Sequence, residues 1–490
     1  MGRDVSARVF SREDRRIYRD KVRRCLDVFA RLLRESRFGF DQPLVGLEIE
    51  LNIVDARAEP TMRNAEVLNA IAQPDWATEL GQFNVEINIP PHSFSGDGPR
   101  HLEDLVRQRL NLAEQTAASV GGHLVMIGIL PTLKEDDVRE GTLSANPRYR
   151  LLNEQIFAAR GEDLHLEIDG VERLDTYADS ITPEAACTSV QLHLQVTPED
   201  FPAHWNAAQV IAGAQVAVGA NSPYLFGKEL WRETRISLFE QATDTRPAEL
   251  KAQGVRPRVW FGERWITSVF DLFEENVRYF PALLPICEDE DPVEVVDRGE
   301  TPELAELTLH NGTVYRWNRP VYAVVDGRPH LRVENRVLPA GPTVIDAVAN
   351  AAFYYGLMRV LPYAERPIWT QMPFAVAADN LFTAARYGLD ARIYWPDLGE
   401  VPAAELVLRR LLPLAYEGLD LWRVDPVVRD RLLGVIEGRC LAGVNGASWQ
   451  AATAESYAGL GRGEALRRMT LDYVERMHGN EPVHTWDRPG

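Results

Sequence analysis

Residues 46–52, GLEIELN, place two glutamates inside a short stretch of otherwise mostly apolar residues. Side chains of a β-strand alternate between its two faces, so Glu48 and Glu50 would lie on one face, about 7 Å apart. Two like charges on one strand face are unfavourable unless something positive lies close to them. The stretch therefore predicts a strand with one apolar face and one acidic face, and the acidic face requires a cation or a positive side chain.

Three further stretches repeat this alternation of apolar and polar residues. They are QFNVEINIPP with Asn84, Glu86 and Asn88, VQLHLQV with Gln191, His193 and Gln195, and LRVENRV with Arg332, Glu334 and Arg336. Any one of these strands could have an ordinary solvated face. The four together contain no lysine on the polar face, which favours a shared, inward-facing surface.

The residue types on this face indicate a metal and anion site. Carboxylate and amide oxygens with one imidazole and no sulfur suit Mg²⁺ or Mn²⁺. Arginine binds carboxylate or phosphate through a forked pair of N–H groups. The chain has no GxxxxGK[ST] sequence, and GLGRG (459–463) does not match GxGxxG. If the chain uses ATP, we expect it to hold the phosphates through metal.

Periodicity along the chain predicts an α+β fold. Helices are expected over 11–37, 64–73, 101–121, 202–219, 343–360, 401–417 and 463–477, and strands over 44–54, 82–89, 123–130, 187–196 and 331–341. Residues 221–267 and the acidic segment 287–297 are expected to be mostly loop. Long connections between strands favour a mixed or antiparallel sheet.

The domain organisation expected from this order is a single catalytic unit over residues 1–490. It would comprise an N-terminal helical extension (1–40), a sheet-bearing core for metal and ATP (41–345) and a helical C-terminal part (346–490). The extension is an amphipathic, arginine-rich helix, for which packing on its own domain is favoured over a membrane-surface role.

Composition excludes several classes of partner. The formal net charge is −19, and no lasting basic patch is present, which argues against nucleic acid. No segment is expected to cross a membrane, and no secretory signal is recognised. The four cysteines are far apart and fit reduced thiols, so a cytoplasmic protein is expected. The oligomeric state is left open.

Five motifs in order resemble those of a known enzyme family. They are GLEIELN, ELGQFNVEIN (79–88), VQLHLQV, NSPYLFGKELWRETR (221–235) and RPHLRVENRVLPAGPT (328–343). The series is similar to that of bacterial glutamate–cysteine ligases, specifically their second family, which includes weaker carboxylate–amine ligases. The N-terminal helix and extra sequence near 280–327 depart from the family pattern.

The resemblance implies a fold related to glutamine synthetase and the guanidino kinases, with an antiparallel sheet curled into a funnel. It also implies roles for individual residues. The expected metal ligands are Glu48, Glu50, Glu86, His193 and Glu334, and the expected phosphate-facing catalytic arginines are Arg336 and Arg235. Asn84, Gln191 and Arg332 are expected, with Arg336, to contact ATP or to support the ligands. Glu79 is either a metal neighbour or an acid at a helix end.

The implied reaction is an ATP- and Mg²⁺-dependent ligation of the γ-carboxylate of glutamate to an amino acid, with cysteine as the family's acceptor, through an acyl phosphate. Three alternatives stay open. The acceptor could be a different amine, the chain could be a guanidino phosphotransferase, or it could be a non-catalytic regulator that binds metal or nucleotide.

Overall fold

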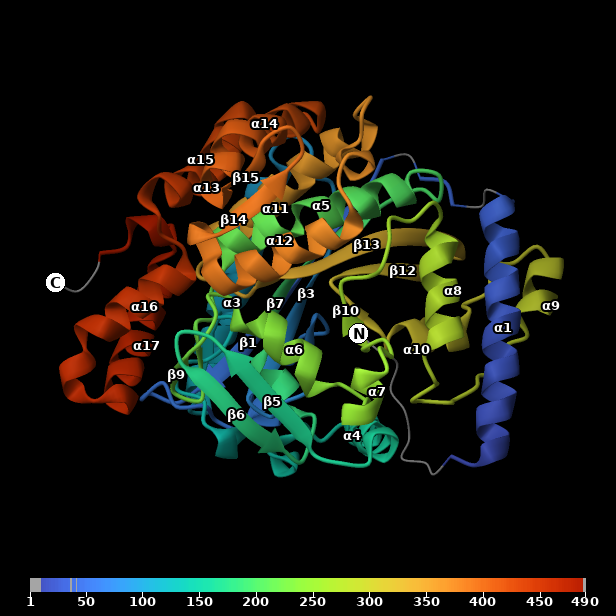
Figure 1. Cartoon of the computed structure of the whole chain (residues 1–490), viewed down its shortest axis with the longest axis horizontal. Helices are drawn as coiled ribbons and strands as arrows, with labels where there is room; N and C mark the ends of the chain where they lie inside the picture. Colours follow the sequence, from blue (N-terminus) through green and yellow to red (C-terminus); the bar gives the residue numbers. More distant parts are fainter. Residues whose placement is uncertain (1–9, 36–37, 41, 488–490) are drawn as a thin grey trace.

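A curled antiparallel β-sheet forms the centre of the protein (Figure 1). The computed structural model describes residues 10–35, 38–40 and 42–487, so residues 1–9 and 36–37 of the predicted extension lie outside the described residues. The sheet has seven strands in the order β12–β13–β7–β1–β3–β2, with β4 added beside β1. The strands are β1 (Val45–Val54), β2 (Trp76–Thr78), β3 (Asn84–His92), β4 (His123–Val125), β7 (Ser189–Gln195), β12 (Asn318–Val325) and β13 (Arg328–Pro339). All their pairings are antiparallel, which confirms the predicted fold class.

The register aligns the polar residues of neighbouring strands. Glu50 on β1 lies opposite Glu86 on β3, and Glu48 lies opposite Gln191 on β7. Glu334 on β13 lies opposite His193. Because residues directly opposite in a sheet point to the same face, the four alternating patterns form one continuous polar surface.

Helices cover the apolar face of the sheet. α5 (Phe201–Gly219) packs on β13 and α11 (Val344–Val360) packs on β7, with α12 (Phe374–Tyr387) and α14 (Leu412–Leu421) stacked beyond them (Figure 1). Nearly every residue of α5 and α11 is buried, as expected for helices that are apolar all round. The hydroxyl of Tyr355 on α11 lies 3.0 Å from the carbonyl oxygen of Gly46 and 3.1 Å from that of His193.

Among the described residues, one helical stretch is long and apolar enough to cross a membrane by length and composition. It is Val344–Tyr363, with a mean hydropathy of 1.2, and the sequence analysis expected no such segment. Its most apolar window is 89% buried inside the protein. The stretch is therefore a core helix that packs beneath the sheet.

Shorter elements flank the polar side of the sheet (Figure 1). They are α4 (Pro147–Arg160), the hairpin of β5 (Leu164–Asp169) and β6 (Arg173–Ala178), the 3₁₀ turn Thr182–Ala186 and α6 (Thr234–Ala242). The hydroxyl of Tyr149 on α4 donates to the carbonyl oxygen of Thr78 at 3.1 Å. α6 packs on both β5 and the 3₁₀ turn. These contacts bring segments far apart in sequence to the polar face.

The N-terminal helix packs on the extra sequence of the core. α1 (Arg12–Arg34) begins with a capping box between Ser11 and Asp14 and lies against α8 (Val269–Tyr279), α9 (Pro292–Asp297) and α10 (Ala305–Asn311). The ring of Phe29 lies 4.8 Å from that of Phe273 and 5.7 Å from that of Tyr322 on β12. The two departures from the family pattern therefore form one packed unit at the edge of the sheet.

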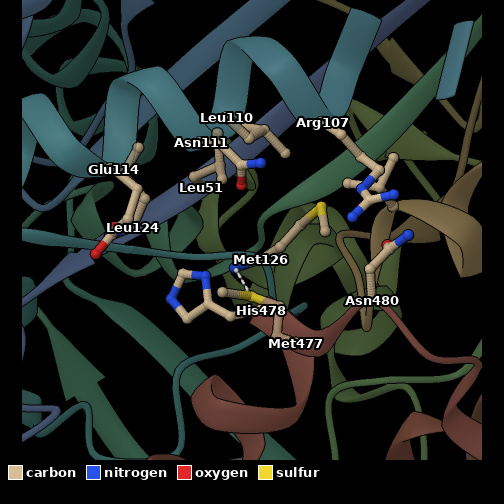
Figure 2. A pocket seen from close by; sticks show the side chains of 11 residues that line it. Leu51, Arg107, Leu110, Asn111, Glu114, Leu124, Met126, Met477, His478 and Asn480 are labelled. Carbon is tan, nitrogen blue, oxygen red and sulfur yellow. Dashed lines mark hydrogen bonds between the residues drawn. The ribbon is translucent and has the colours of Figure 1, made fainter. Parts of the chain in front are cut away.

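The last C-terminal α-helix is hydrogen-bonded to Met126, the residue that follows β4 of the sheet. The C-terminal helices are α15 (Pro426–Ala442), α16 (Gly446–Ser456) and α17 (Arg462–Gly479), and α17 ends near β4 and α3 (Gly98–Ser119). A small pocket of about 40 Å³ lies there. The amide nitrogen of Met126 donates to the sulfur of Met477 at 3.3 Å, and both residues line the pocket (Figure 2). The hydroxyl of Tyr473 donates to the carbonyl oxygen of Met126 at 2.8 Å.

The strand predicted over 123–130 is shorter than expected. Only His123–Val125 pair with β1. The following residues are buried and apolar, which explains the prediction, but their carbonyl groups bond elsewhere. The amide of Thr188 donates to Gly128, and the side chain of Asn52 donates to Ile127.

The polar segment 221–267 is more regular than expected. It contains α6, α7 (Ala248–Ala252), β8 (Tyr224–Leu225), β9 (Lys228–Glu229) and β10 (Val259–Trp260). Its polar residues indicated a loop, but Asn221, Ser222 and Glu233 are fully buried and hydrogen-bonded to one another. Buried polar networks have no periodic signature in the sequence, so the pattern misled the prediction.

Several other elements also differ from the prediction. The acidic segment contains α9, whose first turn is capped by Asp291. The helix expected over 401–417 is preceded by a hairpin of β14 (Arg392–Trp395) and β15 (Gly399–Pro402). It is then divided into α13 (Ala403–Leu406), a π-helical turn (Val407–Leu411) and α14. Strands β5, β6, β12 and the short β11 (Tyr315–Arg316) were not predicted. β6, β11 and β12 have no clean apolar–polar alternation, whereas the LHLEID sequence of β5 does alternate and was overlooked.

Candidate active site

Three carboxylates come together at one end of the polar face. Glu50 and Glu86 are opposite one another in the sheet, and Glu79 precedes the turn that leads into β3. One oxygen of each lies within 4.8 Å of those of the other two. Burial and then the charges of Glu48 and Glu50 raise the pKa of Glu86 to about 8. Burial and then Glu86 raise the pKa of Glu79 well above its usual value.

Crowded, buried carboxylates with raised pKa values need a counter-charge to be ionised at neutral pH. The trio offers only oxygen donors, which is the set that Mg²⁺ and Mn²⁺ prefer. The side chains present therefore fit a divalent cation. Glu79 was expected to be either a metal neighbour or an acid at a helix end; the structure places it beside Glu50 and Glu86 and not at the end of a helix.

Glu50 is oriented by neighbouring donors on β7. Its carboxylate accepts from the amide of Ser189 at 2.6 Å, from the hydroxyl of Ser189 at 3.0 Å and from Nε2 of Gln191 at 2.8 Å. Gln191 in turn accepts from Arg336 through its Oε1. The amide of Gln191 thus bridges an acid of the trio and an arginine of β13.

A second group forms around His193. Arg332 donates from Nε to Nδ1 of His193 at 3.0 Å. The other ring nitrogen, Nε2, lies 3.0 Å from Oε1 of Glu48, yet it is buried and makes no well-aligned hydrogen bond within the described residues. Burial raises the pKa of Glu48, but the neighbouring His193 opposes this, and the net shift of the pKa is downward. Because Nδ1 accepts from Arg332, the proton of the neutral imidazole lies on Nε2, the nitrogen that faces Glu48.

Gly46 on β1 lies next to this imidazole. A Cβ atom at position 46 would lie 3.4 Å from Cβ and 3.7 Å from Cδ2 of His193. These are ordinary van der Waals distances, so the packing of His193 does not require a glycine at this position.

Glu334 is held between two arginines. Arg319 on β12 donates to it at 2.8 Å, and Arg336 donates at 2.6 Å. Burial alone would raise the pKa of Glu334, but Arg319 and Arg336 hold it well below its usual value. Arg319 was not among the site residues expected from the sequence, because β12 was not predicted as a strand.

Arg235 lies beneath this group, with its guanidinium directed at main-chain oxygens. It is 2% exposed and donates to Glu233 at 3.1 Å, to the carbonyl of Val337 at 2.6 Å and to that of Arg336 at 3.3 Å. The pairing of β13 with β7 shifts register between Asn335 and Leu338. Arg235 thus satisfies carbonyl groups that this irregularity leaves without strand partners.

Asn84 lies next to the trio on β3. Its Nδ2 donates to Asn52 at 3.1 Å, and its Oδ1 is buried with no hydrogen-bond partner in the part of the chain that the structure describes.

Glu184, on the 3₁₀ turn, was not among the residues expected from the sequence. Burial and then Glu50 raise its pKa to about 8. A single acid in a short turn has no periodic signal by which the sequence could have identified it.

Two solved structures are similar to this chain over most of its length. The solved structure of a glutamate–cysteine ligase from Francisella tularensis in complex with AMP superposes with a TM-score of 0.56 at 11% identity, covering 93% of this chain and 91% of that one. A bifunctional glutathione synthetase from Pasteurella multocida gives a TM-score of 0.48 at 12% identity, covering 93% and 55%. No curated protein sequence matches the chain.

The chain shares its fold with the Francisella tularensis ligase, and the family match places it among the carboxylate–amine ligases, a class of enzymes that uses ATP to make an amide. The sequence model of glutamate–cysteine ligase family 2 matches residues 44–453, and the chain belongs to this family. The resemblance seen in the five sequence motifs is thereby confirmed.

Proposed function

We propose that the protein is an ATP- and Mg²⁺-dependent ligase that joins the γ-carboxylate of glutamate to the amine of an amino acid. Cysteine is the first candidate acceptor, on the basis of the family. The observation that carries the proposal is the acid trio of Glu50, Glu79 and Glu86 on the inner face of the sheet, next to the arginines of β13.

The proposed metal ligands are Glu48, Glu50, Glu79, Glu86, His193 and Glu334. Bound Mg²⁺ would neutralise charge on the phosphates of ATP. The crowding of the carboxylates supports this assignment. For His193, ligation through Nε2 requires that this nitrogen lose the proton facing Glu48 and that Nδ1 no longer accept from Arg332. For Glu334, exchange of one arginine contact for a cation is required, since Arg319 and Arg336 both occupy its oxygens.

The proposed role of Arg336 is to stabilise the phosphoryl group during transfer. It is the arginine that reaches both Glu334 and Gln191. Arg235 would act through the main chain of β13 as a positioning residue. Asn84, Gln191 and Arg332 would orient the ligands or contact ATP, and the free Oδ1 of Asn84 supports such a contact.

In the proposed reaction, an oxygen of the glutamate γ-carboxylate attacks the γ-phosphorus of ATP, and the bond from that phosphorus to the ADP oxygen breaks. The amine then attacks the carbonyl carbon of the acyl phosphate, loses a proton, and expels inorganic phosphate. The products are an amide, ADP and phosphate.

Two structural observations support one cytoplasmic catalytic unit. α1 and the C-terminal helices are both packed on the sheet. The four cysteines are free, which is consistent with a reducing compartment.

The direct test is phosphate release from ATP with Mg²⁺ and glutamate across a panel of amines, with product mass. Cysteine should give the highest kcat/KM. If another amine gives a higher value, that amine is the acceptor. ADP without free phosphate, from a guanidino substrate, would favour a phosphotransferase. No release with any amine, from folded protein, would contradict the ligase proposal.

A further inference from the structure

A second concave surface lies at the edge of the molecule, away from the polar face of the sheet. It is a groove of about 420 Å³ between α1 and the segment that follows α8. Its walls include Arg15, Arg19, Arg23 and Arg278, and its floor includes Tyr18 and His310. A volume of this size is within the range of small-molecule sites. No residue of the candidate active site lines it.

The charge of the groove is opposite to that of the chain. Four arginines line it, and no aspartate or glutamate does, although the chain has 72 acidic residues and a net charge of −19. Positive charges gathered in a concave surface concentrate the field and attract anions.

The arginines of α1 differ according to the direction in which they face. Three of those outside the groove are paired with acids: Arg16 with Glu13, Arg24 with Asp291 and Arg31 with Asp297, each at 2.6 Å. Arg19 and Arg23, which line the groove, form no ion pair with any described carboxylate. The same helix therefore neutralises three of its outer arginines and leaves Arg19 and Arg23 without a described carboxylate partner.

Part of the groove is already ordered. Arg15 donates to the carbonyl of Ala282 at 3.1 Å and to Gln155 at 2.6 Å, so its guanidinium is fixed by neutral partners and keeps its full charge. His310 is 4% exposed, and its Nδ1 has no hydrogen-bond partner within the described residues. Ordered side chains lower the entropy lost when a ligand binds.

We propose that this groove binds a small anion with at least two phosphate or carboxylate groups, at a site separate from the active site. Two anionic groups match the spread of arginines along successive turns of α1, because Arg15, Arg19 and Arg23 recur every four residues and share one face. The concave shape and the buried Tyr18 and His310 at its base favour a small molecule over a flat lipid surface.

The test is isothermal titration calorimetry on the full chain without Mg²⁺, using inorganic pyrophosphate and, separately, citrate. R19Q/R23Q removes two groove arginines. R16Q/R24Q is the matched control, since it makes the same charge change on the same helix outside the groove. We expect saturable binding of at least one anion, weakened by about tenfold or more in R19Q/R23Q, because each lost charged hydrogen bond costs free energy.

The outcomes separate the alternatives. Tighter binding of pyrophosphate would assign a phosphate ligand, and tighter binding of citrate a carboxylate ligand. The proposal is overturned if neither anion binds, if R19Q/R23Q binds like the wild type, or if R16Q/R24Q loses as much. Binding of phosphatidylserine vesicles without binding of either anion would also overturn it, in favour of a membrane surface. No outcome depends on ligase activity.

Discussion

Glu50 is the residue on which the acid trio depends, because it contacts both the other acids and the donors of β7. We predict that Glu50→Gln abolishes turnover while the fold is retained. A glutamine oxygen can still accept from Ser189, but the charge that holds a cation is gone. Activity should fall by at least about 10²-fold, the usual effect of removing one electrostatic group.

The matched control for that variant is Glu140→Gln, an exposed acid outside the site. Circular dichroism and the urea midpoint of both variants should equal those of the wild type. Unchanged turnover in Glu50→Gln would discredit the site assignment.

Metal binding can be measured without turnover. Because the trio carries crowded carboxylates, Mg²⁺ should raise the thermal midpoint of the wild type, and a concentration of 100 Kd corresponds to about 2.7 kcal/mol. E79Q and E86Q should lose this shift, and E140Q should keep it. A shift of equal size in all the variants would place the ion elsewhere.

At the scale of elements, β13 is held by a buried ion pair beneath it. Arg235→Met should destabilise the protein by about 3–5 kcal/mol, because it leaves Glu233, which is fully buried, without its charged partner. Urea unfolding measures the loss, and E233Q/R235M should recover much of it. If R235M loses less than about 1 kcal/mol, the pair does not support β13.

His310 on α10 makes stability depend on pH. Burial and the nearby Arg258 lower its pKa to about 4 in the folded chain, although the carbonyl of Asn276 opposes this. Between about pH 6.5 and 4 the unfolded chain binds a proton that the folded chain does not, so stability falls as pH falls.

From pH 7 to pH 5 the wild type should therefore lose about 2 kcal/mol more than His310→Gln does, measured by urea unfolding at each pH. Equal losses in the two proteins would show that His310 is not buried in its neutral form.

The elements also show what the sequence could and could not predict. Strict alternation predicted β1, β3, β7 and β13 and placed Glu48, Glu50, Glu86, His193 and Glu334 on one polar face, because the other face of each strand is apolar. Arg319, Glu79 and Glu184 come from an irregular strand, a turn and a 3₁₀ helix. Their approach to the site is set by tertiary contacts, which have no local pattern.

For the whole molecule, the packing of α1 on the insert and on β12 predicts one cooperative unit. Phe29→Ala should cost about 3–5 kcal/mol, because Phe29 is fully buried between Phe273 and Tyr322. Calorimetry of the variant should show a single transition at lower temperature. A separate early transition would mean that residues 1–40 form an independent arm.

The central claim is that ATP activates the γ-carboxylate of glutamate. It is tested most directly with glutamate labelled by ¹⁸O in that carboxylate, incubated with ATP, Mg²⁺, cysteine and the enzyme, followed by mass analysis of the inorganic phosphate. Transfer of one ¹⁸O atom per amide formed is the predicted result, since the attacking carboxylate oxygen leaves with the phosphate. Amide formation with unlabelled phosphate would contradict the account.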